Sequence, residues 1–136
     1  MTRRRGLRDQ HGSTALEFGL MLPMVLVLLV GVIDVGRLIG DQHALDRGVA
    51  AAARYASVNS ASATASTITA QFAAAAAPLI GSCGGCVSVT FSPAGSQGQP
   101  GGTVTVSVSY PWHASAPSLI LFGMTLTSST TLTVLN

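Results

Sequence analysis

Two cysteines, Cys83 and Cys86, have a spacing that supports several kinds of chemistry. A C-x-x-C pair serves as a thioredoxin-like redox site, as half of a zinc site or as a tight structural disulfide. A redox pair follows a strand and opens a helix, whereas this pair precedes an expected strand and encloses two glycines. A zinc site needs two further ligands, but the sequence has no other cysteine and only distant histidines. We expect a structural disulfide if this part is exported, with free thiols or redox or metal chemistry as the alternatives.

The second half of the chain lacks the charged side chains that enzymes commonly use in catalysis. All charged side chains lie between Arg3 and Arg54, and residues 55–136 contain no Asp, Glu, Lys or Arg. A hydroxyl nucleophile needs a neighbouring base and a group that orients it, so the many serines there do not indicate a hydrolase. His113 is interpreted as a loop residue or as an exposed contact for a partner. We therefore predict a protein that is not an enzyme and uses no cofactor or metal ion.

An apolar run from Phe18 to Ile33 contains no charged residue, and with residues 13–16 it approaches the ~20 residues that a helix needs to cross a bilayer. Only a helix satisfies the backbone of an isolated span in lipid, and Pro23 is expected to bend it. A signal peptide would need a small-residue cleavage site just after Ile33, and residues 34–37 offer no convincing one. A buried core helix would need a partner layer, which the rest of the chain is too small to supply. We expect one membrane-spanning helix.

Four arginines, at positions 3, 4, 5 and 8, precede this run and supply most of the formal net charge of +2. A basic arm binds phosphates in many nucleic-acid-binding proteins. Before a membrane span, however, such an arm ordinarily keeps the N-terminus in the cytoplasm and sends the chain after the span outward. We therefore expect a membrane protein with an exported C-terminal part and no nucleic-acid partner.

The carboxylate of Glu17, near the start of the apolar run, does not fit an ordinary anchor, because a charge there is costly unless it is paired or close to the interface. Glu17 lies five residues after Gly12 and is followed by Phe18. This arrangement resembles a type IV prepilin processing site. A Leu-Pro pair in the span, an acidic-x-Gly-Arg exit from it and an alanine-rich helix then follow, up to Ala56. Together these features resemble the TadE-like family of the tight-adherence (Tad) pilus systems.

The resemblance implies that a prepilin peptidase cuts between Gly12 and Ser13, where the absence of a side chain lets the peptidase approach the backbone. It also implies that Glu17, with Phe18 beside it, pairs with the free terminal amine of a neighbouring subunit and so favours one packing register. The alternative is that Glu17 is an interfacial residue in contact with water or headgroups. The partners implied are the peptidase, other pilins and pseudopilins, and the Tad inner-membrane assembly proteins, in a hetero-oligomer.

The function implied is that of a pseudopilin or minor pilin that helps to assemble a Tad/Flp-type pilus for adhesion or secretion. The protein would pass once through the bacterial inner membrane, with its C-terminal domain periplasmic or extracellular, either in the filament or at its base. Two rival functions remain. One is an uncleaved, membrane-anchored binding protein with an exported β domain; the other is a secreted redox module that uses Cys83 and Cys86.

Beyond the span, residues 34–56 keep apolar side chains at helical spacing, which predicts an amphipathic stalk that continues the membrane helix. Arg37 is placed to pair with Asp34 at i, i+3 and with Asp41 at i, i+4. Two interpretations are open for these charges. They mark a solvated helix face, or Asp34 and Arg37 contact another pilus component.

The remaining elements predict an α+β protein with a small antiparallel sheet of about three strands. A short helix is expected over residues 71–80, after a Ser/Ala/Thr-rich stretch that is either a loop or a weak helix. Alternation predicts strands at 87–91 and 103–110, and a last strand is expected at 130–135, with a start as early as Met124. The chain then divides into a leader (1–12), a transmembrane helix (13–36), a helical stalk with connector (37–80) and an exported β-rich domain (81–136).

Overall fold

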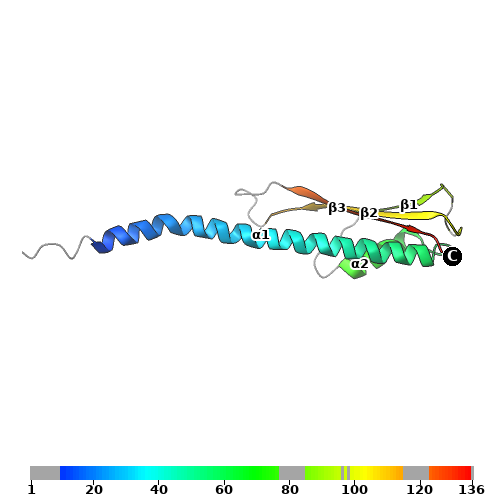
Figure 1. The fold of residues 1–136 in the computed structure, drawn as a ribbon, viewed down its shortest axis with the longest axis horizontal. Coiled ribbons are helices and arrows are strands. Elements are labelled where there is room, and N and C mark those ends of the chain that lie inside the picture. Colours follow the sequence, from blue (N-terminus) through cyan, green and yellow to red (C-terminus); the bar gives the residue numbers. More distant parts are fainter. Residues whose placement is uncertain (1–9, 77–84, 96, 98, 115–122, 136) are drawn as a thin grey trace, which may run out of the picture.

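The computed structural model of the protein describes residues 10–76, 85–95, 97, 99–114 and 123–135. A long helix is followed by a short helix and three strands, and the expected α+β architecture is confirmed (Figure 1). The elements in chain order are α1 (Gln10–Val58), α2 (Ala65–Ala76), β1 (Val87–Ser92), β2 (Thr103–Trp112) and β3 (Met124–Thr133).

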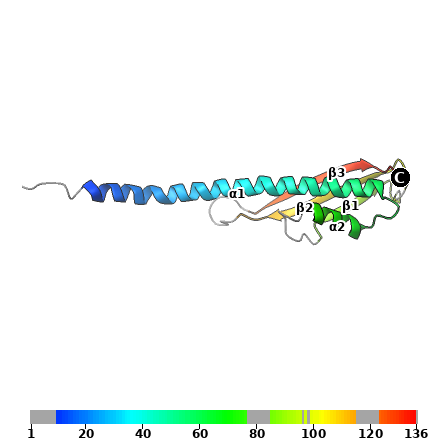
Figure 2. The same ribbon diagram turned by 90° about the horizontal axis from the view of Figure 1, so that it is seen from below.

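Helix α1 is one continuous element of 49 residues, which corresponds to about 74 Å at 1.5 Å per residue. It carries Pro23 in its interior. Its N-terminal half extends away from every other labelled element, whereas its C-terminal half lies along the sheet and α2 (Figures 1 and 2). The same helix therefore forms both the apolar N-terminal segment and one side of the folded domain.

The three strands form an antiparallel sheet in the order β1-β2-β3. In β2, burial alternates as the sequence predicts, with Val104, Val106 and Val108 buried between partly exposed hydroxyl residues. These valines share one face, which packs toward α1, because successive side chains of a strand point to opposite faces. The core thus forms between one face of the sheet and the distal half of α1.

Strand β2 continues to Trp112, two residues beyond the predicted end at Tyr110. Pro111 lacks an N–H donor, which usually confines it to an edge of a sheet. Here the N–H of Ser109 bonds to the carbonyl of Cys86 at 3.0 Å, and β1 begins only at the next residue. Pro111 directs its nitrogen to the same side as Ser109, two residues beyond the last described bond to this edge, so it interrupts none of the described hydrogen bonds between β1 and β2.

The core of α1 consists largely of small side chains. Leu45 and Val49 are fully buried, as are Ala52, Ala53 and Ala56. Alanine at three of these positions lets the sheet and α2 approach the helix backbone closely. The predicted apolar stripe on this part of the helix is confirmed.

The second helix differs from the prediction. It spans Ala65–Ala76 rather than residues 71–80, of which 77–80 lie outside the described part of the chain. The cause is a local cap: the Thr64 hydroxyl accepts from the Thr67 N–H at 3.3 Å, and the Thr67 hydroxyl accepts from the Thr64 N–H at 2.9 Å. This reciprocal pair has the form of a capping box, with threonine at the position where glutamate is usual. The Ser/Ala/Thr-rich stretch therefore contains a helix start.

The chain end is fixed to the same domain. After β3, the N–H of Val134 bonds to the carbonyl of Gly102 at 2.7 Å, and the N–H of Leu135 bonds to that of Ser57 at 3.1 Å. The second bond connects the last described residues to the final turn of α1, whose carbonyls lack partners within the helix. The distal end of the sheet is thereby held against the last turn of α1.

Candidate functional site

The residues of the expected processing site lie in the first three turns of α1. Gly12, Ser13, Glu17 and Phe18 are all exposed, and a Cβ placed on Gly12 would meet nothing within 4 Å. The first four N–H groups of a helix have no partner within it, so the peptide bond after Gly12 belongs to the part of α1 that opens most readily. Ser13 and Glu17, at i and i+4, lie on the same face of the helix.

A continuous apolar surface follows these residues along α1. Most large apolar side chains from Leu16 to Val35 are between 43% and 75% exposed, and only Val27 and Val30 among them are partly buried. Water would not favour such exposure over so long a stretch. One helix in the described part of the chain is long and apolar enough to cross a membrane, and only 6% of its most apolar window is buried. A core helix of a soluble protein would be covered instead. The chain therefore fits a single-pass membrane protein.

Asp34 and Arg37 lie where this apolar surface ends. The Arg37 guanidinium is 3.6 Å from the Asp34 carboxylate, and the arginine side chain is half exposed. Asp34 is 4% exposed, in contrast to its apolar neighbour Ile33 at 60%. The interpretation of these charges as a solvated helix face therefore holds for Arg37 but not for Asp34, which is buried. Their contact with a partner stays a prediction.

Polar side chains of α1 hold the sheet at its membrane-proximal end. The Trp112 indole N–H donates to the Asp41 carboxylate at 3.0 Å, and the Ser128 hydroxyl donates to the Asp46 carboxylate at 2.6 Å. The amide of Gln42 donates to the backbone carbonyl of Thr127 at 3.3 Å. We call these three hydrogen bonds the helix–sheet latch. Sequence reasoning assigned Asp41 to the stalk surface and missed this role, because nothing in the local pattern pairs residues that are 71 positions apart.

The sheet face that points away from α1 is composed of hydroxyl residues. The residues on this face are Ser88, Thr90, Ser92, Thr103, Thr105, Ser107, Ser109, Thr125, Thr127, Ser129, Thr131 and Thr133. Some of them bond across the strands: the hydroxyls of Ser88 and Ser107 are 2.6 Å apart, and those of Thr105 and Thr131 are 2.9 Å apart. The side chains of this face are uncharged, and its hydroxyl groups are able to donate and accept hydrogen bonds.

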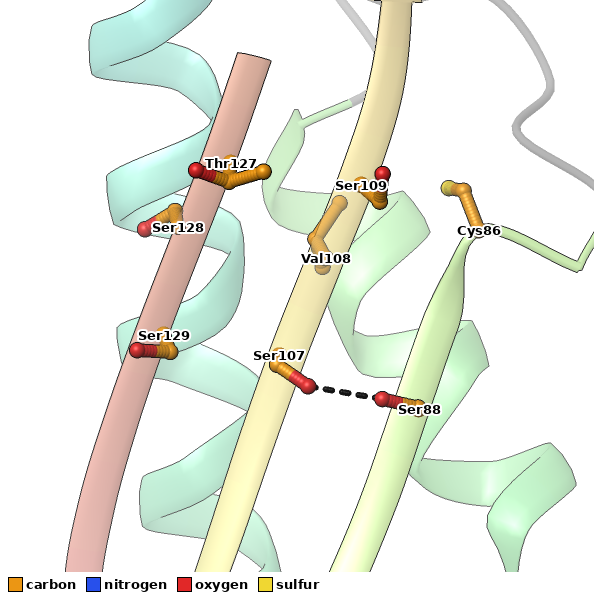
Figure 3. Close-up of a pocket in the computed structure, with 8 residues that line it drawn as sticks. All are labelled: Cys86, Ser88, Ser107, Val108, Ser109, Thr127, Ser128 and Ser129. Atoms are coloured by element: carbon orange, nitrogen blue, oxygen red, sulfur yellow. Dashed lines mark hydrogen bonds between the residues drawn. The ribbon is translucent and has the colours of Figure 1, made fainter. Parts of the chain in front are cut away.

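A shallow hollow of about 410 Å³ lies on this face (Figure 3). Among the described residues it is lined by Cys86, Val108 and the hydroxyl residues around Ser107 and Ser129, without a charged side chain. The hydroxyl groups of this lining are able to donate hydrogen bonds to a bound molecule and accept them from it.

Of the two cysteines, the structure places one. Cys86 is partly exposed and lies immediately before β1, while Cys83 lies outside the described residues. Their disulfide therefore stays a prediction. Within the described residues, no three His, Cys, Asp or Glu side chains gather closely enough to hold a metal ion. His113 is exposed just past the end of β2, and His43 is exposed on α1.

Comparison with known proteins identifies the N-terminal part of the chain. Residues 12–54 match the model of a protein family described as TadE-like protein. The match begins at Gly12 and ends within α1, so it covers the apolar surface, the Asp34–Arg37 pair and most of the helix that supports the sheet. No curated protein and no solved structure matches the chain. The chain thus carries a TadE-like segment, and the expected resemblance is confirmed over those residues.

Proposed function

We propose that this protein is a pseudopilin or minor pilin-like component that helps to assemble a Tad/Flp-type pilus, in adhesion or in secretion. One observation carries the proposal: the TadE-like match begins at Gly12, two residues after the start of the apolar helix α1. The beginning of the family segment and the beginning of the uncovered helix therefore coincide. In the proposal, residues 1–12 are a leader and the mature chain begins at Ser13.

Processing by a prepilin peptidase is favoured by the position of the bond after Gly12. This bond lies in the first turn of α1, where backbone N–H groups have no partners within the helix and local opening costs little. Gly12 adds no side chain that would keep a peptidase from the backbone, and its surroundings are open. Cleavage there would create a terminal amine on Ser13, one helical turn from Glu17.

Association with neighbouring subunits would then offset the free-energy cost of placing two isolated charges at the membrane. Both the Ser13 amine and the Glu17 carboxylate lie at the start of a surface suited to lipid, where isolated charges are costly. Pairing Glu17 with the amine of a neighbouring pilin or pseudopilin neutralises both and fixes the relative height of the two helices. Asp34 and Arg37, at the other end of the uncovered surface, are the proposed contacts for Tad inner-membrane proteins.

The assembly step is tested by variants of Glu17 in cells that contain the Tad apparatus. Glu17→Ala and Glu17→Gln are expected to insert in the membrane normally but to lose co-isolation with the other pilus subunits. Glu17→Asp keeps the charge and serves as the matched control, with co-isolation retained at least in part. Normal co-isolation of all three variants would contradict a role for the carboxylate in assembly.

The rival function is an uncleaved, single-span anchored binding protein. The continuity of α1 through Gly12, with no break at the proposed processing point, is the observation in its favour. In that case the neutral hydroxyl face would be the exported binding surface and residues 1–12 would remain in the mature protein.

A further inference from the structure

The outer edge of β3 is a long strand edge without the features that usually protect one. Its ten residues include no charged side chain and no proline. Its register with β2 runs from Thr133 to Met124 without a bulge. Native sheets commonly protect such an edge with lysine, proline or a bulge, because its unpaired N–H and C=O groups bind other strands. The edge of β3 is therefore suited to pairing with a strand of another molecule.

The hydrogen bonds of β3 show which of its residues direct their backbone groups outward. The N–H of Val134 bonds to Gly102 on the β2 side, whereas the carbonyl of Thr127 and the N–H of Leu135 bond to α1 on the other side. Because the bonding direction alternates along an antiparallel strand, the odd-numbered residues of β3 face outward. Between the two bonds to α1, the outward groups without a partner in the described part of the chain are those of Ser129, Thr131 and Thr133.

Strand β1 forms the opposite edge of the sheet (Figure 2). The carbonyl of Cys86 accepts from the N–H of Ser109 in β2, so the odd-numbered residues of β1 direct their backbone groups outward. These residues are Val87, Val89 and Phe91, and none of the described residues bonds to their outward groups. The strand contains no charged side chain and no proline. Each copy of the sheet therefore presents one open edge at β3 and another at β1.

The apolar segment of α1 limits how two copies can meet. Strand β3 runs in the same direction as α1, because Thr127 bonds to Gln42 and Leu135 bonds to Ser57. Two copies in one bilayer have parallel helices, and spans of identical length lie at the same depth. Antiparallel pairing of two β3 edges would reverse one helix. Parallel pairing of two β3 edges at equal depth would place their outward groups at the same levels, whereas a parallel ladder needs them to alternate.

We infer that the edge of β3 binds the edge of β1 in a second copy of this chain, side by side in the same membrane. Thr90 and Thr131 both lie opposite Thr105 in the sheet register, so they occupy the same level. At equal depth the Thr131 N–H donates to the carbonyl of Val89 in the second copy, and the Thr131 carbonyl accepts from the N–H of Phe91. The hydroxyl faces of the two sheets are then continuous. Because the two edges differ, the contact leaves a free edge at each end for further copies.

This contact goes beyond the proposed function, since it requires two copies in one membrane but neither cleavage of the leader nor another pilus subunit. Cysteine cross-linking of full-length chains tests it in cells that lack a prepilin peptidase. Thr90→Cys and Thr131→Cys are made in two differently tagged chains, which are expressed together at low level and oxidised in the membrane. Neighbouring strands lie about 4.8 Å apart, within the Cα separation of a disulfide. We expect a dimer that carries both tags and disappears on reduction.

The controls separate this dimer from other disulfides. Each variant expressed alone, and the unmodified chain with Cys83 and Cys86, are oxidised in the same way and are expected to give no such dimer. In a chain that carries both substitutions, β2 separates Thr90 from Thr131 by about 10 Å, which is too far for a disulfide within the chain. The double variant is therefore expected to form a ladder of multimers.

Proline substitutions on the β3 edge give a matched pair of variants. Ser129→Pro, in the Thr131→Cys chain, removes an outward N–H within the contact and interrupts no bond to β2. It is expected to lower the yield of the dimer about two- to tenfold, the usual effect of one hydrogen bond. Thr125→Pro makes the same change on the same edge but lies beyond the level of Val87, where β1 begins, and is expected to leave the yield unchanged. An unchanged Trp112 emission maximum verifies that each variant is folded.

Three results would overturn the inference. Absence of the mixed dimer above background would mean that the two edges do not meet. A dimer of Thr131→Cys alone would mean that two β3 edges pair with each other. An equal loss of yield in Ser129→Pro and Thr125→Pro would show that the cross-link does not depend on strand pairing. Because the cells contain no peptidase, each of these results leaves leader processing and the role of Glu17 untouched.

Discussion

Trp112 and Asp41 are joined by a hydrogen bond of 3.0 Å between the indole N–H at the end of β2 and a carboxylate on α1. The two residues are 71 positions apart in sequence, and Trp112 is only 1% exposed. A buried indole N–H needs a partner, because leaving a polar group unsatisfied costs free energy. This bond fixes the end of the sheet at a defined height on the helix that emerges from the apolar segment.

Replacement of Trp112 by phenylalanine removes this donor and leaves the carboxylate without it. We expect a loss of about 1.5–3 kcal/mol in stability, the usual contribution of a hydrogen bond to a charged group, in addition to the smaller buried ring. Hydrogen exchange of the β2 amides in detergent-solubilised protein measures the effect as faster exchange. Asp41→Asn, which keeps an acceptor oxygen, is expected to change the exchange less. Equal protection in Trp112→Phe and the unmodified protein would show that the bond contributes little.

Gly48 allows α2 to pack directly on α1. A Cβ at this position would lie 2.7 Å from the Phe72 ring and 3.1 Å from the Ala76 methyl. Gly48→Ala is therefore expected to destabilise the domain by about 1–3 kcal/mol, the usual cost of overpacking. Urea unfolding followed by Trp112 fluorescence measures it.

Gly40→Ala is the matched control, because a Cβ there would meet nothing within 4 Å. It is expected to stabilise the helix by about 0.5–1 kcal/mol, since alanine is the better helix former. If both substitutions shift the urea midpoint in the same direction, the close packing of α2 on Gly48 is wrong.

Thr64 caps the start of α2, and its loss should release that helix. Thr64→Ala is expected to cost about 1 kcal/mol, as for other N-cap threonines. Thr64→Ser retains the hydroxyl and should restore most of this. Hydrogen exchange at Ile68 and Phe72, both buried in α2, measures the change. Faster exchange in both variants alike would mean that the hydroxyl is not what holds the helix start.

The cysteines are predicted to form a disulfide in the exported protein. Protein recovered from the periplasmic side should bind no alkylating reagent before reduction and two equivalents after it, as measured by intact mass. Cys83→Ser should then make Cys86 reactive without reduction. Alkylation of both thiols before reduction would instead indicate free cysteines, and rapid exchange with added thiols would indicate a redox pair.

The sequence was sufficient for elements whose signal is local. Alternation of valine with serine and threonine located β1 and most of β2, and the uncharged run located the apolar half of α1. The end of β2 and the start of α2 were misplaced for physical reasons. Pro111 lies beyond the last described hydrogen bond between β2 and the chain before β1. The cap of α2 is formed by Thr64 with Thr67 and not with a glutamate. Neither partner is visible in a pattern of single residues.

The candidate site likewise contains residues with a local sequence signal and residues that only the fold brings together. The order of Gly12, Glu17 and Phe18 is a sequence motif, so the residues before the span were recognised directly. The helix–sheet latch joins α1 to residues of β2 and β3 more than 70 positions away, and it depends on the packing of the whole domain. The burial of Asp34 likewise has no local signal, since a charged residue at the end of a span is normally exposed.

The central claim, pilin-type processing of an assembly subunit, is tested most directly by the intact mass and N-terminal sequence of the membrane-inserted protein. The protein is expressed with and without a matching prepilin peptidase, and Gly12→Leu serves as a control that blocks cleavage but leaves the apolar run unchanged. The account predicts a chain that begins at Ser13 only when the peptidase is present and Gly12 is retained. A chain that keeps residues 1–12 in every case would contradict the account and favour an uncleaved membrane-anchored protein.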